Sequence, residues 1–538
     1  MKVLLVGINS KYIHPAMGII QLAANTTWPV TLREFTIKDD PQRIAKEISD
    51  FHADVVGISV YIWNATLVKT ILSQLSQQLT IVVGGPEASY RPAEYFAFSN
   101  VDYLVKDEGE QAFHYLLNYL NGLMPLDEVP NLYYRGEEIK FTFNALPDIT
   151  TIKHDYSLMG NLKHRYLYLE SSRGCPYACS YCLASLEKKV RFFPLSQIKK
   201  EILWAFHIKT PTVKFLDRTF NCDSQRMIEI LSFIQEHDTK QTVFQFEVVA
   251  DILNEETVRF LKQLRPGLVR FEIGIQSANE TTMEAISRKQ NFSQIQTIVQ
   301  QLKPTITIHL DLIAGLPYED KPSFINTFNQ TLLMFPDELQ LGILKALAGT
   351  KIVAEKALHA YVFNPLPPYD VLENKYLTRK DLAEIKLVEE GLNRYYNSHR
   401  FPKTLDYLLK DCQLNPYQLF LTLGTYLSLH PECRLQIKDL AKAFYKAITT
   451  KNQDYFLFLL KQDYLDNAKL KPPLWWDYEL TKSQTKAVLD LFKQQYPQLS
   501  KQNLMHNSRL ITWSNKETNH YYLVLYQPKQ SYTLNKKD

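Results

Sequence analysis

Short apolar segments alternate with amphipathic helical segments over roughly the first 350 residues, and this rhythm limits the fold more than any other feature of the chain. In the first part of the chain, residues 2–7, 54–60, 81–85 and 101–105 are typical of buried strands. Strands this apolar need cover on both faces, which favours a parallel sheet between helices. Ligands of such sheets bind outside the carboxyl ends of the strands. We therefore predict a doubly wound α/β domain over residues 1–140.

A second series of strands follows an irregular, Pro-punctuated stretch over residues 126–165, of which 141–165 are the expected linker. Helical patterns separate its members. Six strands in this order favour a partial barrel over residues 166–350 instead of a closed barrel of eight strands. The predicted strands are 166–170, 213–217, 243–249, 268–275, 305–313 and 338–346.

The rhythm ends after residue 350, and residues 351–538 are predicted to form a mainly helical C-terminal region. Residues 365–369 are Pro-rich, residues 402–498 are aromatic-rich with helical patterns, and residues 521–526 are typical of a strand. The last 138 residues also hold more basic than acidic side chains. A solvated basic surface is the more frequent meaning of such an excess, and a contact with RNA is the alternative.

Composition and cysteine usage indicate a cytoplasmic protein. No apolar run approaches the ~18 residues of a membrane-spanning helix. The first seven residues are too short an apolar run for a signal peptide and are typical of a first strand. Six cysteines in 538 residues, unevenly spread, are too few for a disulfide-built secreted protein.

Three of these cysteines, Cys175, Cys179 and Cys182, fall within eight residues with the spacing C-x3-C-x2-C. Such thiolates indicate a metal centre. A structural zinc ion takes four ligands, and an iron–sulfur cluster usually takes four cysteines. A cluster held by three cysteines on one loop would leave one iron open, and a zinc site that lacks a fourth ligand is the alternative. We expect the other cysteines, Cys222, Cys412 and Cys433, to be structural.

The cysteine motif, which directly follows a predicted strand and has Tyr181 before its third cysteine, resembles the radical S-adenosylmethionine (SAM) superfamily. The resemblance implies a [4Fe–4S] cluster whose open iron binds SAM. It also implies that an electron from reduced flavodoxin or ferredoxin cleaves SAM to a 5′-deoxyadenosyl radical, which abstracts hydrogen from a substrate.

Further segments resemble the SAM-binding motifs of that family. They are residues 246–249, 272–277, 286–288 and 311–317. The equivalent of the family's Gly-Gly-Glu motif is residues 215–221, where Asp217 or the local backbone would replace it in holding the SAM amino group. The resemblance implies that the SAM site contains Tyr181, Glu247, Gln276, Ser277, Arg288 and Asp311.

The first domain resembles the cobalamin-binding class of this superfamily through residues 14–18, 84–87 and 107–110. The resemblance implies that cobalamin contacts Gly18, Gly84, Gly85, Glu108 and Gly109. The D-x-H-x-x-G motif that supplies an axial histidine elsewhere is absent. Residues 50–52 begin like this motif, but Val55 stands at the position where the motif has glycine. A domain that no longer holds cobalamin is the alternative.

Together, these resemblances imply a cobalamin-dependent radical SAM enzyme that methylates an unactivated carbon of an unknown small-molecule or RNA substrate. Residues 351–538 resemble an uncharacterised C-terminal extension of some relatives. A cyclising, rearranging or RNA-modifying radical reaction is the first alternative. A non-catalytic iron–sulfur protein that senses a ligand is the second.

Overall fold

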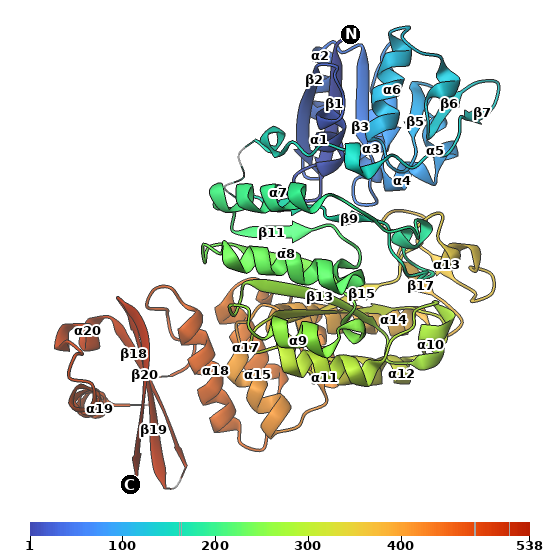
Figure 1. Cartoon of the computed structure of the whole chain (residues 1–538). Helices are drawn as coiled ribbons and strands as arrows, with labels where there is room; N and C mark the ends of the chain where they lie inside the picture. Colours follow the sequence, from blue (N-terminus) through green and yellow to red (C-terminus); the bar gives the residue numbers. More distant parts are fainter. Residues whose placement is uncertain (161, 163, 478–479, 516, 538) are drawn as a thin grey trace. The chain divides into compact units, whose positions relative to one another are not determined.

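The computed structural model describes residues 1–160, 162, 164–477, 480–515 and 517–537 (Figure 1). It consists of two compact units. The first contains Met1–Asp320 and Gly342–Thr378, and the second contains Lys321–Leu341 and Arg379–Asp538. The predicted doubly wound domain and most of the predicted partial barrel therefore share one unit.

The first sheet has seven strands in the order β2-β1-β3-β4-β5-β6-β7. Its first five strands are parallel. They are β1 (Val3–Asn9), β2 (Val30–Thr36), β3 (Val55–Ser59), β4 (Thr80–Gly84) and β5 (Val101–Val105). The main helices between them are α1 (Met17–Ala24), α2 (Pro41–Asp50) and α3 (Ala65–Leu72), and α6 (Glu110–Leu120) follows β5. This arrangement confirms the predicted doubly wound domain.

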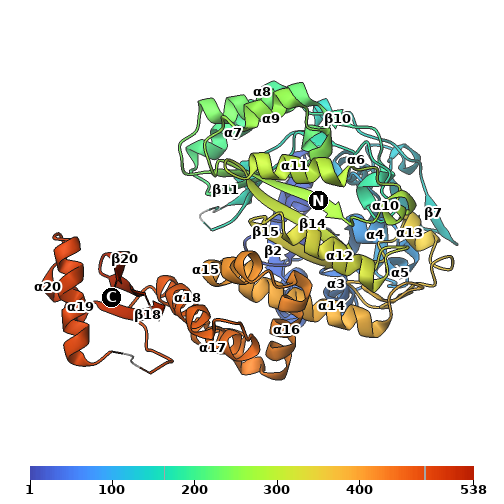
Figure 2. The ribbon, with the colours of Figure 1, turned by 90° about the horizontal axis from the view of Figure 1, so that it is seen from below.

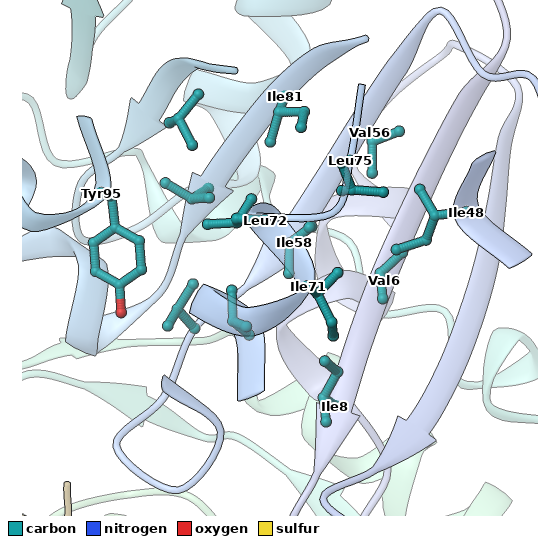
Figure 3. Close-up of a cluster of buried hydrophobic side chains, with 14 of the residues drawn as sticks. Val6, Ile8, Ile48, Val56, Ile58, Ile71, Leu72, Leu75, Ile81 and Tyr95 are labelled. Atoms are coloured by element: carbon teal, nitrogen blue, oxygen red, sulfur yellow. The ribbon is translucent and has the colours of Figure 1, made fainter. Parts of the chain in front are cut away.

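Helices cover both faces of this sheet, as the apolar strands require. Figure 3 shows one face, where Val6, Ile58 and Ile81 of the strands pack with Ile48 of α2 and Ile71 of α3. The other face is buried by α1 and α6. The sheet thus has a core on each side, and its ligands can reach it only at the strand ends.

The stretch over residues 126–165 is more ordered than its sequence predicts. β6 (Leu132–Arg135) and β7 (Ile139–Phe141) extend the first sheet as antiparallel strands. Their position is held over a long range, because Arg135 donates to the carbonyls of Phe96, Phe98 and Val101. Strands this short carry too few residues for an alternating pattern. Residues 161 and 163 of the predicted linker lie outside the described residues.

The second sheet has six strands in the order β15-β14-β13-β12-β11-β8, so the predicted partial barrel is confirmed. Helices α7 (Leu195–His207), α8 (Ser224–Glu236), α9 (Glu255–Leu261) and α11 (Phe292–Leu302) follow one another along one side of it (Figures 1 and 2). The strands are β8 (Leu167–Leu169), β11 (Thr212–Phe215), β12 (Val243–Val248), β13 (Val269–Gln276), β14 (Thr307–Ala314) and β15 (Glu338–Ile343).

The second unit is mainly helical and ends in a sheet. Its longer helices are α12 (Lys321–Leu332), α14 (Arg379–Gly391), α16 (Pro416–Leu429), α17 (Ile437–Ala447), α18 (Gln453–Asn467) and α19 (Lys482–Gln495). The sheet consists of antiparallel β18 (Ser508–Asn515), β19 (Thr518–Tyr526) and β20 (Lys529–Lys537), of which the sequence predicts only part of β19. β20 is mostly polar and exposed, so it carries little alternation. No helix in the described part of the chain is long and apolar enough to cross a membrane.

Candidate functional site

The three clustered cysteines lie between β9 (Ser172–Arg173) and the short helix η4 (Leu183–Leu186). All three line one cavity, here called the cysteine cavity. Protein contacts hold their loop from two sides: the Ser180 amide donates to the Ile286 carbonyl at 2.9 Å, and the Ile352 amide donates to the Ser180 carbonyl at 2.9 Å. Gly174 has φ +89°, and a Cβ there would lie 2.3 Å from the Lys189 carbonyl oxygen. The loop therefore has a fixed path before Cys175.

Five of the six residues of the predicted SAM site also line the cysteine cavity. They are Tyr181, Glu247, Gln276, Arg288 and Asp311. Glu247, Gln276 and Asp311 belong to β12, β13 and β14, and Arg288 lies in the loop after α10 (Glu280–Ala285). Ser277 does not line it. Its buried hydroxyl donates to Glu319 Oε1 at 2.5 Å and accepts from the Asn279 amide at 3.0 Å. Ser277 thus supports the loop after β13.

A break in strand register directs Gln276 into the cavity. The pairing of β13 with β14 shifts between Gly274 and Gln276, and Gln276 has φ +66°. Such a bulge re-aims a side chain at the end of a strand. A Cβ on Gly274 would lie 2.3 Å from Gln276 Nε2, so a side chain there would displace the Gln276 amide group.

Arg288 is fixed next to the cysteines. Its Nη2 donates to the Gly274 carbonyl at 2.7 Å, and its Nη1 lies 3.6 Å from Cys179 Sγ. Within the described residues, Arg288 Nε and Gln276 Oε1 are buried without a hydrogen-bond partner. Buried polar atoms are nearly always paired. These two atoms, together with three thiols on one loop, fit a cavity that holds a thiolate-bound cluster and a polar ligand.

Carboxylates crowd the same cavity. Burial raises the pKa of Glu247 to about 7; Arg218 opposes the rise, and Glu272, Asp311 and Asp217 add to it. Glu272 accepts from Gln245 Nε2 at 2.6 Å. Sequence reasoning missed Arg218 and Glu272 as cavity residues. Glu272 could have been found, because side chains two apart on a strand share a face and Gly274 of the same motif faces the cavity.

Asp217 does not line the cysteine cavity. Its carboxylate accepts from the Ser171 amide at 2.9 Å and from the Ser171 and Ser172 hydroxyls, each at 2.6 Å. The side chain is buried, and burial raises its pKa. The hypothesis that Asp217 holds the SAM amino group is therefore not supported, since these partners occupy both carboxylate oxygens. Arg218 and Thr219 line the cavity at this strand end.

A second cavity lies at the carboxyl ends of the first sheet and is here called the glycine cavity. Its wall contains all five residues predicted to contact cobalamin, Gly18, Gly84, Gly85, Glu108 and Gly109. It encloses about 1080 Å³ of space free of protein atoms, part of which is open to solvent. Leu5, Leu22, Val82, Val105 and Phe113 make much of the wall apolar. Its size and apolar wall fit a large, flat ligand.

Close packing within the protein explains two of the glycines in this cavity. Gly85 has φ +101°, and a Cβ there would lie 2.6 Å from the Val60 carbonyl oxygen. A Cβ on Gly18 would lie 2.8 Å from the Tyr61 hydroxyl. Side chains at these positions would therefore collide with the cavity wall, whatever ligand the cavity holds.

No histidine among the described residues lines the glycine cavity. His52 is exposed in the turn before β3. His14 Nδ1 is 2.7 Å from the Tyr168 hydroxyl, and burial lowers the pKa of its imidazole. The wall thus offers no axial imidazole, in agreement with the missing D-x-H-x-x-G motif.

Arg173 connects the two parts of the first unit. Its guanidinium bonds to Glu108 at 2.9 Å, Glu110 at 2.6 Å and Glu170 at 2.9 Å. Arg191 pairs with Glu108 as well. Burial raises the pKa of Glu110 and of Glu170, whereas the Arg173 guanidinium lowers both. The net effect is a pKa below the usual value for Glu110 and above it for Glu170. Because Gly174 and Cys175 follow directly, this cluster joins the glycine cavity to the cysteine loop.

Comparison with known protein families divides the chain in the same way. Residues 3–117 match the B12 binding domain, and residues 169–330 match the radical SAM superfamily. Residues 357–532 match a family described as a protein of unknown function, DUF4080.

Curated relatives are distant. An uncharacterised methyltransferase of Pyrococcus horikoshii is 25% identical over 378 residues, which cover 66% of this chain and 81% of the relative. The cobalamin-dependent radical SAM methyltransferase TokK of Streptomyces tokunonensis is 24% identical over 404 residues, 68% of this chain and 58% of TokK. The chain thus spans less than two thirds of TokK.

Solved structures share the fold at low identity. OxsB, a cobalamin-dependent SAM radical enzyme with aqua-cobalamin bound, aligns with a TM-score of 0.59 at 15% identity, over 86% of this chain and 80% of OxsB. The radical SAM methyltransferase TsrM of Kitasatospora setae aligns with a TM-score of 0.57 at 15% identity, over 66% of this chain and 78% of TsrM. The cofactors implied are a [4Fe–4S] cluster, SAM and cobalamin. The chain is a radical SAM enzyme of the cobalamin-binding type, with an uncharacterised C-terminal extension.

Proposed function

We propose that the protein is a cobalamin-dependent methyltransferase that moves a methyl group from SAM to an unactivated carbon of a small-molecule or RNA substrate. The observation that carries the proposal is the placement of the two cavities. At the end of β11, Leu216 lines the glycine cavity and Arg218, two residues later, lines the cysteine cavity. Adjacent cavities let one substrate carbon be reached from both, which radical activation followed by methyl transfer requires.

In this proposal Cys175, Cys179 and Cys182 hold the cluster, which supplies the electron that cleaves SAM. Arg288 is positioned to bind the SAM carboxylate, since a guanidinium fork suits that group and the Gly274 carbonyl fixes its orientation. Tyr181, Glu247, Gln276 and Asp311 form the rest of the SAM wall. The electron donor we propose is reduced flavodoxin or ferredoxin, as is usual for the family.

In the glycine cavity, Gly18, Gly84, Gly85, Glu108 and Gly109 line the wall and would contact the cobalamin, which would supply the methyl group. Glu108 keeps its position through two arginines. The apolar wall excludes water, which would otherwise quench a reactive intermediate. All six cysteines are free thiols, in keeping with the cytoplasm that we propose as the compartment.

Anaerobic turnover tests the proposal. The protein is loaded with iron, sulfide and cobalamin, then given dithionite, methyl-labelled SAM and a fractionated cell extract. We expect 5′-deoxyadenosine, S-adenosylhomocysteine and a labelled product, all of which are absent with Cys179→Ala. Nuclease treatment of the extract separates an RNA substrate from a small molecule.

Two outcomes contradict the proposal at different levels. Formation of 5′-deoxyadenosine without S-adenosylhomocysteine would indicate a non-methylating radical reaction. Formation of neither product by protein with an intact cluster would indicate a non-catalytic iron–sulfur protein.

A further inference from the structure

We propose that Arg218 binds an anionic group of the substrate, a carboxylate or a phosphate, and thereby restricts the substrate class of the enzyme. The inference rests on the proposed function, since it presumes a substrate between the two cavities. Arg218 lines the cysteine cavity next to Glu247, and yet its side chain is 58% exposed.

Arg218 is poorly neutralised for a cavity arginine. Within the described residues its side chain has one ion-pair partner, Glu247, at 3.4 Å. A guanidinium has five N–H donors in a planar fork, and a two-pronged pair with a carboxylate or phosphate is its strongest arrangement. The long single contact with Glu247 leaves most of these donors for another anion.

The second arginine of the cavity is less exposed and is held in place by the protein. Arg288 is half-buried, donates to the Gly274 carbonyl and contacts Cys179. SAM carries a single carboxylate, and Arg288 suffices to bind it. The cavity therefore presents one more guanidinium than SAM requires, and the exposed one follows Leu216 of the glycine cavity by two residues.

The backbone at Arg218 is rigid, so the guanidinium starts from a fixed point. The preceding Asp217 is held by Ser171 and Ser172, and the Leu216 amide donates to the Leu169 carbonyl at 2.8 Å. Leu216 itself is 36% exposed. An anionic site beside an exposed leucine matches a substrate whose apolar reacting carbon lies close to its charged group.

Small anions test the inference without knowledge of the substrate. Protein with its cluster reduced and SAM at saturation is titrated with carboxyl-labelled acetate or with inorganic phosphate. Electron–nuclear double resonance then detects carbon or phosphorus close to the cluster. We expect at least one anion to bind, and Arg218→Gln to weaken it by about tenfold or more. Glu247→Gln should strengthen binding, because it removes the competing carboxylate.

Lys214→Gln is the matched control. It removes a positive charge from the same face of β11 but outside the cavity, where the ammonium lies 4.6 Å from the centre of the Tyr166 ring, and it should leave anion binding unchanged. The acetate and phosphate arms distinguish a carboxylate substrate from a phosphorylated one. Binding of either anion that depends on Arg218 and not on Lys214 supports the inference.

Three results overturn it. One is wild-type protein that binds neither anion, and another is Arg218→Gln that binds them as well as wild type. The third is Arg218→Gln that weakens SAM as much as Arg288→Gln does, because Arg218 is then a SAM ligand. None of these results depends on methyl transfer. Failure of the proposed function would instead be seen as anion binding without any methylated product.

Discussion

The two cavities of the first unit differ in the balance of apolar and charged groups in their walls. The glycine cavity has many apolar side chains beside the Arg173 ion pairs, and its shape leaves no room for side chains at Gly18 and Gly85. The cysteine cavity has three thiols, two arginines and three carboxylates in its wall. A large ring can be bound through shape and the exclusion of water, whereas a cluster and a small charged ligand need fixed donors and acceptors. Mutations should therefore act in different ways on the two sides.

The largest expected effect is the loss of the metal centre alone. Cys179→Ala should remove nearly all bound iron, because a cluster held by two thiolates has lost a third of its protein ligands. Corrin absorbance after loading with cobalamin should persist, since no wall residue of the glycine cavity changes. Cys222→Ala, a half-buried thiol outside both cavities, is the control and should keep its iron. Full iron content in Cys179→Ala would refute the ligand assignment.

A mutation of Arg173 should affect both cavities, because its ion pairs join the glycine cavity to the cysteine loop. Arg173→Met leaves Glu110 and Glu170 buried without their guanidinium, and losing one partner of a buried ion pair costs about 3–5 kcal/mol. Urea unfolding of the cofactor-free protein would measure this loss. Arg43→Met removes two exposed ion pairs in the same unit, with Asp39 and Glu47, and should cost only about 1 kcal/mol. Equal losses in the two variants would argue against a connecting role for Arg173.

A substitution at Gly85 should affect only the shaped cavity. Gly85→Ala combines a left-handed backbone with a contact of 2.6 Å to the Val60 carbonyl, and should lower the free energy of unfolding by about 2–3 kcal/mol. Gly122→Ala has φ +72° and nothing within 4 Å, so it should lose only about 1 kcal/mol. The difference between the variants reports the collision. Corrin retention should fall in Gly85→Ala while iron content stays unchanged.

The smallest expected effect is on SAM affinity. Arg288→Gln should keep the cluster and weaken SAM by about tenfold, because one charge-assisted pair is lost. The change that SAM causes in the electron paramagnetic resonance of the reduced cluster would provide the titration. If Arg288→Gln instead lost its iron, the contact with Cys179 would matter more than the bond to SAM.

The sequence predicted a helix or strand well where the residues of that element alone carry the pattern typical of it. The strand predicted over residues 101–105 is β5, with the same bounds. β20 was missed because its polar, exposed residues have no apolar alternation. Its place is decided by pairing with β19 and not by its own sequence.

The same distinction applies to the site. The cysteine spacing is a local signal, and the structure brings the three thiols into one cavity. The partners of Arg173 and Arg191 could not be predicted, because they lie 63 and 83 residues away at Glu110 and Glu108. An arginine next to a metal motif has no sequence mark that distinguishes it from a surface ion pair. The motif around Ser277 predicts a ligand contact, and its hydroxyl bonds to Glu319 within the protein, a partner 42 residues away that the motif does not indicate.

The ion pairs of Arg173 also limit how this architecture can be recombined. A cobalamin-binding domain taken from another protein would meet, at the start of the cysteine loop, a buried cation that needs acids at the positions of Glu108 and Glu110. A donor domain without them would leave that cation paired only with Glu170 at the junction. Exchange of modules, in the laboratory or in evolution, therefore requires the two halves of this contact to travel together.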